Sequence, residues 1–140
     1  MFFETRVQTY WDDADAAGMV YFAHFFRFAE YAETELFRST GTERMKLYNE
    51  HDIWMPRVES FAKFSEPIRA EEAIFVRIRT RFKGEKTVRM EFEILSVPDR
   101  SLLAEGYVTA VCIDRRSSKS RPLPLAMREV FLRAAADTPE

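Results

Sequence analysis

The spacing of the hydrophobic residues changes along this 140-residue chain from the period of a strand to that of a helix and back. Residues 3–11 alternate between two faces, which is typical of a strand with one buried side. Over about residues 21–40 the apolar side chains recur at three- and four-residue steps, so we expect one long helix that ends near Gly41. Four further alternating segments predict strands at roughly 57–66, 72–82, 87–97 and 102–113.

The connections between the last four predicted strands are short, and residues 83–86 and 98–101 have the composition of hairpin turns. These strands should therefore be antiparallel. The long helix should present a wide aromatic face that a curved sheet could cover, formed by Phe22, Phe25, Phe26, Ala29, Ala32, Leu36 and Phe37. With short helices expected at 43–51 and 125–135, the pattern predicts one α+β domain over residues 1–140.

Composition excludes several classes of function. The formal net charge of −2 gives no reason to expect a nucleic-acid partner. The chain has only four glycines and no glycine-rich phosphate-loop motif, which disfavours a nucleotide-binding fold. Its single cysteine, Cys112, cannot form an intramolecular disulfide, and His24 and His51 are too far apart in sequence for a compact metal site. No signal peptide and no membrane-spanning run are recognisable, so we expect a cytoplasmic protein without a membrane partner.

The segment between the first strand and the long helix carries the most specific pattern in the chain. It reads Asp13-Ala14-Asp15-Ala16-Ala17-Gly18-Met19-Val20-Tyr21-Phe22-Ala23-His24-Phe25. Two carboxylates precede a glycine, and an aromatic pair leads into the helix. Because the first amides of a helix lack internal partners and lie at the positive end of its dipole, this loop could present a carboxylate and hydrogen-bond donors together.

This segment closely resembles the signature of the 4-hydroxybenzoyl-CoA thioesterase family, in residue types, spacing and strand–loop–helix context. The resemblance extends over most of the chain and implies the hotdog fold, a curved antiparallel sheet wrapped around one long central helix. The chain also resembles the 1,4-dihydroxy-2-naphthoyl-CoA thioesterases, in Val20-Tyr21-Phe22 and in Arg121-Pro122-Leu123-Pro124. The implied activity is hydrolysis of an aromatic or short- to medium-chain acyl-CoA, without metal or organic cofactor.

The resemblance also implies roles for individual residues. The catalytic carboxylate would be Asp15, and the group that polarises the thioester carbonyl would be the backbone amide of Phe22. Some relatives have Tyr or His where Phe22 stands, so a side-chain hydrogen bond at that position is missing here. The substrate would be contacted by Gly18, Tyr21, His24, Glu30, Pro56 and Val58. Segment 54–58 would come from the partner subunit of a homodimer, which we expect to assemble further into a homotetramer.

The chemistry of thioester hydrolysis agrees with this assignment. The carbonyl carbon needs a nucleophile, and the carbonyl oxygen needs preorganised donors. The Asp15 carboxylate could attack the carbon directly or deprotonate a water, and the residue pattern leaves both routes open. Asp13 is expected to be a structural carboxylate that binds backbone amides, and Asp12 to be solvated. If Asp15 failed, the helix carboxylate of Glu33 would be the next candidate.

Coenzyme A carries several phosphates, so its site should be basic. Two clusters qualify. Lys83 and Lys86 lie at a predicted hairpin, and Arg115 and Arg116 follow the last predicted strand. Other functions remain open at this point: a hydrolase specific for 1,4-dihydroxy-2-naphthoyl-CoA, an acyl-carrier-protein thioesterase, an enoyl-CoA hydratase, or a non-catalytic acyl-CoA-binding module.

Overall fold

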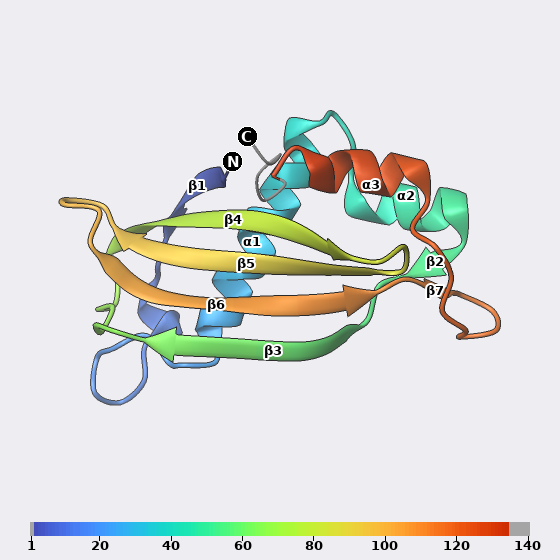
Figure 1. Cartoon of the computed structure of the whole chain (residues 1–140). Helices are drawn as coiled ribbons and strands as arrows, with labels where there is room; N and C mark the ends of the chain where they lie inside the picture. Colours follow the sequence, from blue (N-terminus) through green and yellow to red (C-terminus); the bar gives the residue numbers. More distant parts are fainter. Residues whose placement is uncertain (1, 135–140) are drawn as a thin grey trace.

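A long helix lies across one face of a five-stranded antiparallel sheet in the computed structural model, which describes residues 2–134 (Figure 1). The helix is α1, His24–Ser39, and the strand order in the sheet is β1-β4-β5-β6-β3. The strands are β1 (Phe3–Gln8), β3 (Arg57–Phe64), β4 (Ala73–Lys83), β5 (Thr87–Ser96) and β6 (Leu102–Val111). The predicted α+β arrangement, with a curved sheet around one long helix, is confirmed.

The central hairpin β4–β5 has a continuous register from Ile74 opposite Ser96 to Lys83 opposite Thr87. Its turn contains Gly84 at a φ of +75°, a backbone conformation that residues with a Cβ rarely adopt. Strands β1 and β3 lie at the two edges of the sheet. They are the sides from which the sheet could be extended by another chain.

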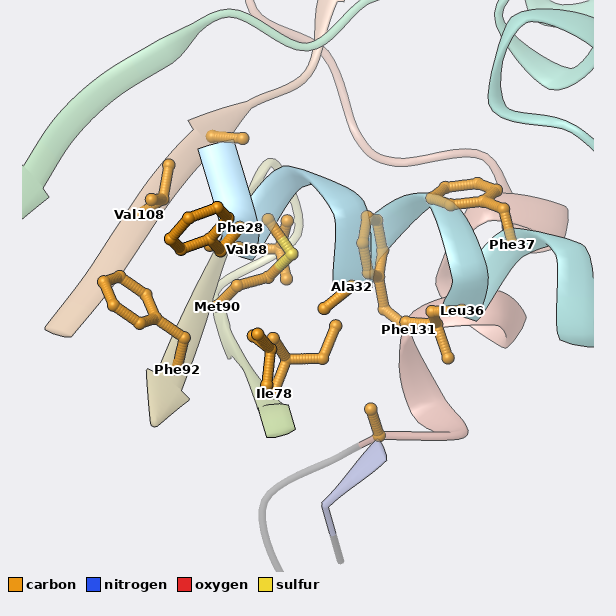
Figure 2. Close-up of a cluster of buried hydrophobic side chains, with 14 of the residues drawn as sticks. Phe28, Ala32, Leu36, Phe37, Ile78, Val88, Met90, Phe92, Val108 and Phe131 are labelled. Atoms are coloured by element: carbon orange, nitrogen blue, oxygen red, sulfur yellow. The ribbon is translucent and has the colours of Figure 1, made fainter. Parts of the chain in front are cut away.

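The core lies between α1 and the inner face of the sheet, where apolar side chains of the two layers pack together (Figure 2). The prediction of the buried helix face was wrong at two positions. Phe22 precedes the helix and is 59% exposed, whereas Phe28 is fully buried. The cause is the late start of the helix at His24, because residues 21–23 form a turn instead. The stripe that faces the sheet then runs through Phe25, Phe28 and Ala32.

The last long strand contains the small residues Ala104, Gly106 and Ala110, which predict that another element approaches it closely. The structure shows such an approach at Gly106. A Cβ atom at Gly106 would collide with the carbonyl oxygen of Phe61 on β3 and would lie 2.8 Å from the ring of Phe92 on β5. The glycine therefore lets β3 and β6 pair closely beside a large core ring.

The remaining elements gather at one end of the sheet. They are α2 (Arg44–His51), the short pair β2 (Ile53–Trp54) and β7 (Ile113–Asp114), and α3 (Leu125–Leu132), which packs on α1. The predicted strand 102–113 is divided at Cys112, a buried residue whose amide binds the carbonyl of Lys86. The predicted first strand ends early, because residues 11–13 form the short 3-10 helix η1 (Trp11–Asp13). The last residue of the predicted helix 125–135 lies outside the described residues. No helix within residues 2–134 has the length and apolar character needed to cross a membrane.

Candidate active site

The loop between η1 and α1 is a compact turn held by its own hydrogen bonds. The amide of Asp15 donates to the carbonyl of Met19 at 2.8 Å, and Ala14 pairs with Val20 across the loop. Gly18 has a φ of +79°, which closes the turn at little steric cost. One carboxylate oxygen of Asp15 accepts the amide of Ala17 at 2.8 Å, so its side chain has a defined direction although the residue is exposed.

Asp15 and Phe22 lie together in a cleft of about 350 Å³. The other residues that line it are largely apolar. They come from the same loop, the first turn of α1, the end of β3 and the segment after β3: Met19, Val20, Phe25, Phe64, Ser65, Glu66, Pro67 and Ile68. The rings of Phe25 and Phe64 meet edge to face with centroids 4.7 Å apart. The cleft thus combines a carboxylate with an aromatic wall.

The backbone amide of Phe22 is available to a ligand. The amide of His24 donates to the carbonyl of Tyr21, and the amide of Phe25 donates to that of Phe22. The amide of Ala23, like that of Phe22, donates no backbone hydrogen bond within residues 2–134. The Phe22 amide donates no hydrogen bond within residues 2–134. It lies just before α1, at the positive end of the helix dipole, where a negatively charged oxygen would be stabilised.

Asp13 and His24 join the loop to the helix. The buried carboxylate of Asp13 accepts the amide of Tyr10 at 2.8 Å and lies 3.0 Å from Nδ1 of His24. This arrangement agrees with the predicted structural role of Asp13. Tyr21 is half exposed. Its ring packs against those of Phe22 and His24, with centroid distances of 4.8 Å and 5.8 Å.

Glu30 and Glu33 belong to a separate cluster of charges beneath the start of β3. Glu30 accepts hydrogen bonds from Arg44 and Arg57, both at 2.8 Å. Burial acts to raise the pKa of Glu30, but the charges of these two arginines outweigh it and hold the pKa below 4.5. Glu33 is fully buried and also binds Arg57 and Arg44. Since Glu33 has no exposed surface in the protomer, it is poorly placed to replace Asp15.

The other predicted contacts lie at the opposite end of β3 from the cleft. Pro56 accepts the amide of Val111 just before β3 begins, whereas the cleft is formed where β3 ends. The eight residues of β3 span roughly 25 Å. Figure 1 shows the 12–23 loop near one end of β3 and the loop after β7 near the other. Val58, at the start of this edge strand, is 60% exposed.

The four predicted CoA-binding residues share that distant end. The carbonyl of Lys86 accepts a hydrogen bond from the amide of Cys112, and the amide of Arg115 donates to the carbonyl of Asp52. Lys83 ends β4 beside them. The guanidinium of Arg115 stacks on the ring of Trp54, 4.0 Å from its centroid. The side chain of Arg116 is 89% exposed and makes an ion pair to Asp52.

Sequence reasoning missed the segment 64–68, which forms one wall of the cleft. A strand was predicted to run through residue 66, but β3 ends at Phe64, and Ser65 and Glu66 turn back to bind the carbonyl of Leu103. Pro67 was the one local signal of this change, because proline cannot donate to a strand ladder.

Comparison with known proteins places this geometry in a family. Residues 9–133 match the thioesterase-like superfamily. The chain belongs to that superfamily. The match covers the loop with Asp15, the long helix and strands β3 to β6 of the sheet, and it confirms the predicted thioesterase relationship and hotdog fold.

Three similar proteins illustrate the relationship. The acyl-CoA thioester hydrolase YbgC of Escherichia coli is 29% identical over 130 residues, which cover 92% of this chain and 95% of YbgC. A 1,4-dihydroxy-2-naphthoyl-CoA hydrolase of Synechocystis is 26% identical over 117 residues, covering 84% of this chain and 85% of the relative. The crystal structure of a 1,4-dihydroxy-2-naphthoyl-CoA thioesterase from Synechocystis superposes with a TM-score of 0.88 at 23% identity, covering 94% and 96% of the two chains.

These similarities confirm the predicted class of enzyme, a thioester hydrolase. Within residues 2–134, no three histidine, cysteine, aspartate or glutamate side chains are grouped so that they could hold a metal ion.

Proposed function

We propose that this protein hydrolyses an acyl-CoA thioester to the free acid and CoA, with Asp15 as the catalytic carboxylate and the amide of Phe22 as the carbonyl-polarising donor. The observation that carries the proposal is that Asp15 and Phe22 line one cleft and that the Phe22 amide donates no backbone hydrogen bond within residues 2–134. The relatives named as acyl-CoA and 1,4-dihydroxy-2-naphthoyl-CoA hydrolases support the choice of thioester.

The reaction can follow two balanced routes. In one, a carboxylate oxygen of Asp15 attacks the carbonyl carbon, CoA leaves as the thiolate, and water then hydrolyses the mixed anhydride. In the other, Asp15 takes a proton from water as the water attacks, and the proton passes to the departing thiolate. In both, negative charge develops on the carbonyl oxygen, where the Phe22 amide and the helix dipole stabilise it. Single turnover in heavy-oxygen water tests for the anhydride route, because water that attacks the Asp15 carboxyl carbon of the anhydride leaves its label on Asp15 and an oxygen of Asp15 in the product.

The lining of the cleft favours an aromatic or short- to medium-chain acyl group. Phe22, Phe25 and Phe64 offer faces and edges on which a planar acyl group can stack. The carboxylates of the cleft, Asp15 and Glu66, are not matched by a lysine or arginine among its lining residues. We therefore expect the CoA phosphates to bind elsewhere, and we propose no metal or organic cofactor.

We propose that the cleft is completed by a second copy of the chain. Within residues 2–134, β3 pairs only with β6, and its other edge exposes Val58 and Phe64, at 60% and 46%. Two such edges joined antiparallel about a two-fold axis would place the start of the partner's β3 beside the end of this one. Pro56, Val58 and the basic groups near Arg116 would then reach the cleft from the partner subunit. Pairing of two dimers into a tetramer is part of the same proposal.

The test is Asp15→Asn, assayed by thiol release from benzoyl-, hydroxybenzoyl-, dihydroxynaphthoyl- and fatty acyl-CoA esters. We expect kcat to fall by about 1000-fold or more while the fold is kept, because the amide cannot attack or accept a proton. Asp12→Asn is the matched control, since Asp12 is exposed in η1, just before the loop, and the variant should retain normal turnover. Turnover near the wild-type rate in Asp15→Asn would refute the assignment.

A further inference from the structure

We propose that Asp13 and His24 form a positioning pair that fixes the distance between the Asp15 carboxylate and the Phe22 amide. The inference rests on the proposed function, since it assigns these two residues a role in that reaction. Neither residue lines the cleft. They act through the loop that does, and they are positioning residues rather than catalytic ones.

The first observation is that Asp13 makes contact with both ends of the loop. Its carboxylate accepts the amide of Tyr10, at the exit from β1, and lies 3.0 Å from Nδ1 of His24, the first residue of α1. Its own carbonyl accepts the amide of Tyr21 at 2.9 Å. One buried residue thus links the strand exit, the turn before the helix and the helix itself.

The second observation concerns His24. Because an ionised carboxylate only accepts hydrogen bonds, the Nδ1 atom that faces Asp13 carries a proton. The imidazole ring also meets Tyr21 edge to face at 5.8 Å, and Tyr21 packs on Phe22 at 4.8 Å. The pair therefore contacts both the loop with Asp15 and the aromatic residues that carry the oxyanion amide.

The chemical consequence follows from the two roles in the cleft. Asp15 is two residues after Asp13, and Phe22 is two residues before His24. Linking Asp13 to His24 closes the segment 13–24 into a ring, so the Asp15 carboxylate and the Phe22 amide cannot separate without breaking a partly buried, charge-assisted hydrogen bond. A loss of about 1 Å in alignment is enough to cost on the order of 100-fold in rate. Substrate affinity, which depends on the cleft walls and the partner, should change much less.

The decisive variant is His24→Leu, which fills similar space without a donor. We expect kcat to fall by about 30- to 100-fold with KM for the best acyl-CoA ester changed less than threefold. His24→Asn should return kcat to within about fivefold of wild type, because its side-chain amide can donate to Asp13. His51→Leu, at the other histidine of the chain, is the control and should have the wild-type kcat. A wild-type kcat in His24→Leu, or equal losses in His24→Leu and His24→Asn, would overturn the proposal.

Hydrogen exchange tests the link between Asp13 and His24 independently of enzymatic activity. Hydrogen exchange of the amides in segment 14–22 should be at least tenfold faster in His24→Leu than in wild type, with unchanged exchange in β4 and β5. The same acceleration should occur in Asp13→Asn, whose single carbonyl oxygen cannot replace both carboxylate contacts. Unchanged exchange in both variants would refute the pair, whatever the substrate. If no thioester were cleaved by the wild-type protein while exchange changed as stated, the proposed function would fail and the linkage would stand.

Discussion

Asp12, Asp13 and Asp15 are chemically alike and lie within four residues, yet their surroundings separate their roles. Asp12 is exposed, Asp13 is buried between an amide and an imidazole, and Asp15 faces the cleft with one oxygen bound to Ala17. A carboxylate with two strong donors is a poor nucleophile, because attack would break those bonds. Of Asp13 and Asp15, Asp15 has fewer donors and is the one that lines the cleft.

Glu30 provides a residue-scale prediction about pH. In Glu30→Gln the two arginine contacts weaken, and we expect a loss of about 1 kcal/mol at pH 7, a modest value because the Glu30 side chain is 41% exposed. The folded pKa of Glu30 is below 4.5, so its contribution is complete above pH 4.5 and is lost as the pH falls through the folded pKa. Urea unfolding of both proteins between pH 7 and pH 3 should show the difference shrinking with acidity.

The control for this experiment is Glu35→Gln, which removes a carboxylate paired with Arg38 on the exposed face of the same helix. Its stability should differ little from wild type at any of these pH values. A Glu30→Gln difference that stayed constant or grew on acidification would contradict the assigned direction of the pKa shift.

At the scale of elements, hydrophobic period predicted most of the fold because each strand and helix is buried on one side. Strand β4 alternates without a break from Ile74 to Thr80, and its centre was predicted correctly. The failures occur where a tertiary contact ends an element. Cys112 leaves the sheet when its amide binds Lys86, and Ser65 turns when its amide binds Leu103. Neither partner is near in sequence, so local pattern could not reveal these ends.

Helix α1 gives a prediction at this scale. Phe28 is completely buried against the sheet, so Phe28→Ala should leave a cavity and lower the free energy of unfolding by about 3–5 kcal/mol. Phe61→Ala is the matched comparison, because that ring lies on the outer face of β3, 49% exposed and stacked on Tyr107. It should cost about 1 kcal/mol or less. If urea denaturation showed the same loss of unfolding free energy in both variants, Phe28 would not be a core residue packed between α1 and the sheet.

At the scale of the whole molecule, the cleft could be predicted only in part. The positions of Asp15 and Phe22 in the cleft could be predicted from the sequence, because one loop carries both residues. The cleft wall from Phe64 to Ile68 could not be predicted, because its position depends on where β3 ends. The basic residues near Arg116 lie about one length of β3, roughly 25 Å, from the end of the strand that forms the cleft. In the proposed dimer, no property of a single chain's sequence determines which cleft they serve.

A mixing experiment tests whether the cleft is shared. Asp15→Asn should lack turnover, and a Lys86→Glu/Arg116→Glu variant should have a strongly raised KM for acyl-CoA. After the two are unfolded and refolded together, statistical pairing places one intact cleft in each mixed dimer, so roughly a quarter of the wild-type kcat/KM should return. Recovery that depends on co-refolding supports the shared cleft, whereas no recovery would contradict it. Mixing the two proteins already folded, immediately before assay, is the control.

Cys112 lies where β6 ends, completely covered, and burial raises the pKa of its thiol above 9.0. An enzyme that generates free CoA works in a rising concentration of a reactive sulfhydryl, which can form mixed disulfides with any accessible thiolate of the protein. Here the only sulfhydryl of the chain is both protonated and out of reach. The protein should therefore resist capping by its own product, and a chromogenic thiol reagent added to the native enzyme should report released CoA alone.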